Sequence, residues 1–192
     1  MSHQKPHLAH HLIHIFNGLF GASFQTVLVR GDAEPIYLPS DGENPQNRVV
    51  FAHGYFASAL HEIAHWCIAG KKRRTMVDFG YWYRPDGRTT QEQSLFEKVE
   101  VKPQALEWIF SVSANHPFHF SADNIAGGQA CAGSAFKQSV WHQVHRYLHG
   151  GLPKRASQFQ QALSRFYGGP QPLQIACFAR PESEAELTIP HL

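Results

Sequence analysis

The strongest sign of chemistry in this sequence is a five-residue segment, His61-Glu62-Ile63-Ala64-His65. In a helix each residue turns the chain by about 100°, so His61 and His65 project about 40° apart and one turn apart along the axis. Both imidazoles can therefore reach a single metal ion. Glu62 falls beside His65, where a carboxylate can act as a general base or orient a ligand without binding the ion. The pattern predicts a metal site with His61 and His65 as ligands.

Two histidines leave a third protein ligand to be found. Glu97 and Glu100 stand one helical turn apart in an apolar stretch, LFEKVEVKPQALEW, over residues 95–108. Burying a carboxylate is costly unless something compensates its charge, and a divalent cation would do so. We expect Glu100 to be the ligand and keep Glu97 as the alternative. An ordinary amphipathic helix whose glutamates face water also fits this pattern.

Three further residues are candidates for binding the substrate. His53 lies between an expected strand and the helix of the motif, which places it near the same pocket or gives it a local structural role. Tyr81 and Tyr83 alternate with Trp82 in an aromatic segment that predicts a strand, so both share one face. That face would line a substrate groove.

A basic run follows the helix of the motif, and it consists of Lys71, Lys72, Arg73 and Arg74. Positive charge beside the carboxyl end of a helix complements the helix dipole, so a solvated turn explains it. The alternative is a docking patch for an acidic protein or an RNA beside the metal cleft.

The remaining pattern predicts a single α+β domain over residues 1–192, in which a small sheet packs against several helices. The expected core covers about 8–170 and the extended C-terminal tail 171–192. Helices are expected over 8–20, 56–70, 135–150, 156–169 and on either side of Pro103, which must start, kink or break the helix. Strands are expected over 25–31, 34–40 and 47–54. The helix of the motif is expected to be zincin-like.

Composition narrows the classes of protein. The 192 residues are 43% hydrophobic and 17% charged, which fits a folded protein, and the net charge of +2 argues against bulk binding of nucleic acid. No apolar run approaches the ~20 residues of a membrane span. The N-terminus lacks the apolar segment of a secretion signal, and three scattered cysteines argue against a disulfide framework. We therefore expect a cytoplasmic protein without direct nucleic-acid or membrane partners.

Two histidines and a carboxylate leave coordination positions open, and three functions follow from that. With Zn²⁺ and Glu62 as the general base, the site is that of a zinc-dependent metallopeptidase. With Fe²⁺, the same donors support O₂ activation and hydroxylation. A metal-stabilised binding module without turnover would show the same residues.

A longer resemblance bears on this choice. The segments EPIYLP (34–39), NRVVFAHGYFASALHEIAHWCIAGKKRR (47–74), VDFGYWYRPDGR (77–88) and FEKVEVKPQALEW (96–108) are collinear with the bacterial elongation factor P hydroxylase family, which the chain resembles over roughly residues 10–170. The resemblance implies a metal-dependent monooxygenase that hydroxylates the β-lysylated lysine of elongation factor P.

The resemblance also implies the site and its cofactors. The family's metal ligands would fall on His61, His65 and Glu100, and Glu62 would orient a ligand histidine or a bound water. The expected metal is Fe²⁺, with Zn²⁺ able to replace it in a purified protein, and O₂ is the expected co-substrate. Elongation factor P is the expected partner, for which the basic run 71–74 would be a dock. The oligomeric state and the electron donor stay open.

Overall fold

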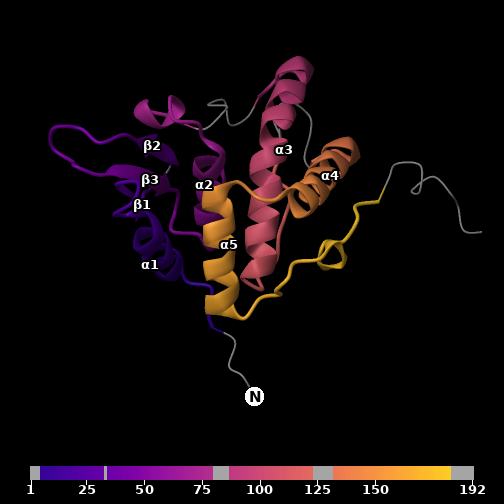
Figure 1. The fold of residues 1–192 in the computed structure, drawn as a ribbon. Coiled ribbons are helices and arrows are strands. Elements are labelled where there is room, and N and C mark those ends of the chain that lie inside the picture. The colour runs from indigo at the N-terminus through magenta and orange to yellow at the C-terminus, as the bar shows by residue number, and fades with distance from the viewer. Residues whose placement is uncertain (1–4, 33, 80–86, 123–131, 183–192) are drawn as a thin grey trace, which may run out of the picture.

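A computed structural model describes residues 5–32, 34–79, 87–122 and 132–182 of the chain. In that part of the chain a three-stranded sheet and five α-helices form one α+β domain, which confirms the predicted fold class. Figure 1 shows the sheet on one side of the molecule and α3 and α4 on the other, with α2 between them. The helix that carries the motif therefore lies at the centre of the fold.

The sheet has the strand order β1-β3-β2. Strand β1 (Thr26–Arg30) pairs in parallel with β3 (Asn47–Phe51), and β2 (Ile36–Leu38) pairs with β3 in antiparallel orientation. All three strands lie where the sequence predicts them. Asp78 adds a bridge to Tyr37, while the expected aromatic strand with Tyr81 and Tyr83 falls outside the described residues.

A sharp turn connects the sheet to helix α2 (Phe56–Ile68). His53 and Gly54 both adopt positive φ values, 54° and 71°. This conformation turns the chain directly after β3, so that the helix can start. Ile63, Ala64 and Trp66 of α2 are buried in the core. The opposite stripe of the helix is polar and faces a cleft.

Helix α3 (Thr90–Ser113) packs against α2 and carries the candidate carboxylates. It begins with a capping box, in which the Thr89 side chain accepts from the Glu92 backbone N–H and the Glu92 side chain accepts from the Thr89 N–H. The expected helix on either side of Pro103 is confirmed, and the proline neither starts nor breaks it, because α3 continues through this residue. Pro103 has no N–H to donate to the Val99 carbonyl, four residues earlier in the helix. Val99 is 37% exposed, so water can reach this part of the helix.

Three further helices complete the domain: α1 (Ala9–Phe20), α4 (Ser134–Gly150) and α5 (Lys154–Tyr167). Short 3-10 turns cover Arg73–Thr75 and Ile175–Cys177. The largest fully buried side chains come from α1, β1, β3, α2, α3 and α5 and form one core: Leu12, Phe16, Phe20, Leu28, Phe51, Leu60, Ile63, Leu106, Ile109, Phe110, Phe159 and Leu163.

The segment after residue 170 is not wholly extended. Its 3-10 turn leads to Phe178, which is buried and packs edge-on against Trp108, and Trp141 Nε1 donates to the Phe178 carbonyl. The packed core thus extends past the expected boundary at residue 170. Within the described part of the chain, none of the helices combines the length and apolar character that a membrane crossing needs.

Candidate metal centre

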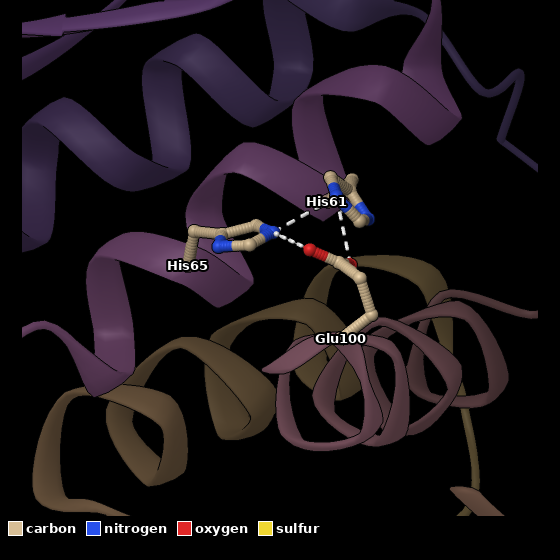
Figure 2. Close-up of side chains that lie close together, drawn as sticks. All are labelled: His61, His65 and Glu100. Carbon is tan, nitrogen blue, oxygen red and sulfur yellow. Dashed lines mark hydrogen bonds and ion pairs between the residues drawn. The ribbon is translucent and has the colours of Figure 1, made fainter. Parts of the chain in front are cut away.

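Three predicted ligands converge between α2 and α3 (Figure 2). The Nε2 atoms of His61 and His65 lie 3.0 Å apart. Glu100 places Oε1 3.3 Å from His65 Nε2 and Oε2 3.6 Å from His61 Nε2. Among the residues that the structure describes, this is the one group of three or more His, Cys, Asp or Glu side chains arranged closely enough to hold a metal ion. Two helices, each fixed by the core, set its geometry.

A second glutamate of α3 orients His61. Glu107 is buried, and its Oε2 lies 2.8 Å from His61 Nδ1. A proton on Nδ1 donates to this carboxylate, which directs Nε2 toward His65 and Glu100. Partners of this kind hold the rings of metal-binding histidines in place and make the ligand nitrogen more basic.

The charges around His61 change its protonation. Burial disfavours the imidazolium, but the hydrogen bond and charge of Glu107, followed by the charge of Glu100, outweigh it and raise the pKa of His61 to about 10. In the metal-free protein His61 is therefore an imidazolium that donates from Nδ1 to Glu107, and its Nε2 lies 3.0 Å from His65 Nε2.

Glu100 has the ionisation state and the unsatisfied oxygen that are expected of a metal ligand when no metal ion is bound. Burial opposes its ionisation, yet the charge and hydrogen bond of His65 and the charge of His61 hold the pKa of this carboxyl below its ordinary value. Its Oε2 is buried and has no hydrogen-bond partner. An ionised oxygen buried without a hydrogen bond is costly, and a divalent cation would compensate it. The donor set of two imidazoles and one carboxylate fits Zn²⁺ or Fe²⁺.

The three candidate ligands line a cleft of about 630 Å³. Its lining combines these ligands with two further glutamates, aromatic rings and small side chains: Pro35, Ala57, Ser58, Glu62, Phe79, Phe96, Glu107, His119, Phe120 and Ser121. The cleft is open to solvent and large enough to admit a long side chain to the site.

Glu62 also lies on this cleft, at its border with a smaller pocket of about 30 Å³ that His65 shares. Burial raises the pKa of Glu62, against the lowering effect of the two histidines. His61 donates from Nδ1 to Glu107, so the structure gives Glu107 the orienting contact that the sequence suggested for Glu62.

Two other sequence candidates lie away from the three ligands. Glu97 is half-buried, accepts a hydrogen bond from Gln93 and does not line the cleft. His53 is exposed and lines a different hollow with Arg30 and Asp32. Its backbone has a positive φ of 54°, and its ring lies 5.7 Å from that of Tyr55, the residue before α2, outside the cleft that the three ligands line.

The basic run divides into two pairs. Lys71 and Lys72 are exposed. Arg73 forms an ion pair with Asp78, and Arg74 donates to the Ala69 carbonyl just beyond the end of α2. The arginines therefore stabilise the chain after the helix, as the turn interpretation expects, and the lysines alone face solvent fully.

Sequence reasoning missed Glu107 and the aromatic lining of the cleft. Glu107 lies between Leu106 and Trp108, so the signal that identified Glu100, a carboxylate among apolar residues, was present there too. Phe79, Phe96 and Phe120 come from three distant segments, and only the folded chain brings them to one cleft.

Fold and site together define the class: an α+β protein with an open cleft lined by two histidines and one glutamate that are close enough to hold a metal ion. Comparison with known families then identifies the chain. The family model described as "Elongation factor P hydroxylase" matches residues 15–178, and the chain belongs to this family.

A relative supports the same assignment. The chain is 50% identical over 172 residues to a Haemophilus influenzae protein named "Elongation factor P lysine hydroxylase", an alignment that covers 90% of this chain and 96% of that protein. All of α2, α3 and the cleft between them lie within the matched residues 15–178. The comparisons give no support to a metallopeptidase.

Proposed function

We propose that this chain hydroxylates the β-lysylated lysine of elongation factor P in a metal-dependent reaction, with Fe²⁺ as the metal and O₂ as the co-substrate. The observation that carries the metal dependence is the convergence of His61, His65 and Glu100 on one point in an open cleft. The name of the H. influenzae relative supports the substrate and the reaction. A translation factor as substrate also places the reaction in the cytosol.

The hydroxylation reaction determines which co-substrates the site needs besides the protein substrate. Conversion of C–H to C–OH by O₂ consumes two electrons and two protons and releases one water, so an external reductant is part of the proposal. Fe²⁺ bound by His61, His65 and Glu100 would supply the activation of O₂ that an unactivated C–H bond requires.

The chain's own side chains perform the remaining tasks. Glu107 holds the Nδ1 proton of His61 and so keeps Nε2 directed at the metal position. Phe79, Phe96 and Phe120 provide apolar surface for the methylene groups of a lysyl side chain. The cleft then presents one carbon of that side chain to the metal position.

Intact-mass analysis tests this proposal. β-Lysylated elongation factor P is incubated with the protein, Fe²⁺, O₂ and a reductant, and a gain of one oxygen, about 16 Da, is expected. His61→Ala should give no product, whereas Glu97→Gln, which changes a carboxylate outside the cleft, should give product at the wild-type rate. Unchanged substrate mass with metal-loaded protein would refute the proposal.

A further inference from the structure

The charge of the cleft points to the kind of group that it binds. Three glutamates line it, Glu62, Glu100 and Glu107, while no lysine or arginine is among the described residues of its lining. A divalent cation with neutral histidines would offset two of the three negative charges. The remaining charge favours a cationic substrate group and disfavours an anionic one.

The three glutamates differ in what they already contact. Glu100 lies 3.3 Å from His65 Nε2, and Glu107 lies 2.8 Å from His61 Nδ1, so both serve the candidate metal centre. Glu62 makes no hydrogen bond or ion pair with any described residue, although it lies between the two histidines in sequence and lines the cleft. Of the three glutamate carboxylates in the described lining of the cleft, that of Glu62 is therefore the one available to bind a substrate group.

The surroundings of Glu62 suit an alkylammonium group. Phe79, Phe96 and Phe120 line the same cleft, and aromatic rings bind both methylene chains and ammonium ions. Ser58, one turn before Glu62 on α2, adds a hydroxyl acceptor on this lining. A carboxylate in a cleft that is also lined by aromatic rings discriminates an ammonium from a neutral group of the same length, because a desolvated carboxylate without a cation is costly.

We infer that Glu62 is the specificity residue of the cleft and binds an ammonium group of the β-lysyl moiety on the substrate. This inference rests on the proposed function for the identity of the ligand. Glu62 acts in recognition, so it should govern substrate affinity, whereas His61, His65 and Glu100 should govern metal binding.

The test compares two synthetic peptides that span the target lysine of elongation factor P. One carries the β-lysyl group and the other a hexanoyl group, which has the same chain length and no amines. Dissociation constants are measured calorimetrically with Zn²⁺-loaded protein, which separates binding from turnover. Wild-type protein should prefer the β-lysyl peptide, and Glu62→Gln should reduce that preference by about tenfold or more while leaving affinity for the hexanoyl peptide unchanged.

Glu43→Gln is the matched control, since it removes the same charge from the exposed loop between β2 and β3 and should retain the preference. An unaltered preference in Glu62→Gln, equal weakening of both peptides, or a wild-type protein without preference would each overturn the inference. A Glu62-dependent preference in a protein that fails to hydroxylate elongation factor P would refute the proposed function and leave the inference standing. Bound Zn²⁺ measured in each variant shows that the metal centre is intact.

Discussion

At the scale of single residues, the site depends on a proton held at one atom. Glu107 accepts from His61 Nδ1 at 2.8 Å, which leaves Nε2 to face His65 and Glu100. A carboxylate with this role makes the ligand nitrogen more basic and fixes the ring. A residue outside the segment His61–His65 therefore orients one of the candidate ligands.

Replacing Glu107 by glutamine tests this role. The amide still fits the space but carries no charge, so we expect metal affinity to fall by about 10- to 100-fold. Competition against a chelator measures the affinity. Glu97→Gln on the same helix is the control and should bind metal like the wild type; equal affinity in both variants would contradict the role of Glu107.

The raised pKa of His61 predicts a pH dependence of stability. Its value of about 10 in the folded, metal-free protein exceeds the ordinary value of 6.5, so the folded state holds the proton more tightly. This stabilisation is complete below pH 6.5 and is lost as the pH rises toward 10. The free energy of unfolding should fall by about 1 kcal/mol per pH unit over that range.

Urea denaturation of metal-free protein across this pH range measures the effect. Glu107→Gln removes the carboxylate charge that stabilises the His61 imidazolium and should show a shallower slope than the wild type. Parallel slopes in the two proteins would show that the Glu107 contact does not hold the proton on His61.

At the scale of elements, the position of α2 depends on contacts beyond its own sequence. Arg155 of α5 places Nη2 2.6–3.1 Å from the carbonyls of Trp66, Cys67 and Ala69, and its guanidinium stacks on the Trp66 ring at 4.6 Å. Carbonyls at the end of a helix lack the usual i+4 partner, and Arg155 supplies hydrogen bonds to these three in addition to the one that the Ala69 N–H donates to the Trp66 carbonyl. Arg155 thus fixes the helix that carries both histidines.

Arg155→Ala should consequently destabilise the domain. Loss of charged hydrogen bonds to the carbonyls at the end of α2 should cost about 2 kcal/mol in the free energy of unfolding, measured by urea denaturation. Lys154→Ala, which removes an exposed charge one residue earlier, should be close to wild type. Equal stability of the two variants would rule out a stabilising role for Arg155.

The helices and strands also show which parts of the fold could be predicted from the sequence. The periodic apolar residues of α2 and the β-branched residues of β3 predicted both elements where they lie. The continuity of α3 through Pro103 was not predictable, because packing of the helix against α2, α4 and α5 overrides the local loss of one hydrogen bond. His53 was expected near the site on sequence order alone, and its left-handed turn places it elsewhere.

At the scale of the whole molecule, metal binding should couple to folding. The candidate ligands lie on α2 and α3, separated by more than thirty residues in sequence, so an ion binds the folded chain far better than the unfolded one. Zn²⁺ at a hundredfold excess over its dissociation constant should raise the free energy of unfolding by about 2.7 kcal/mol.

Thermal unfolding with and without a chelator measures this coupling. His61→Ala should lose the stabilisation by Zn²⁺. His53→Asn should retain it, since the residue lies outside the cleft and asparagine tolerates the positive φ of 54°. Zn²⁺ stabilisation that persists in His61→Ala would place the ion somewhere else.

The source of the transferred oxygen tests the central claim most directly. β-Lysylated elongation factor P is hydroxylated by the Fe²⁺-loaded protein under ¹⁸O₂ in ordinary water, and the product is analysed by mass spectrometry. A gain of about 18 Da, in place of about 16 Da under ordinary O₂, is the result that a metal-dependent monooxygenase requires, and it should be absent in His65→Ala. A gain of about 16 Da under ¹⁸O₂, or an unchanged mass with metal bound, would contradict the account.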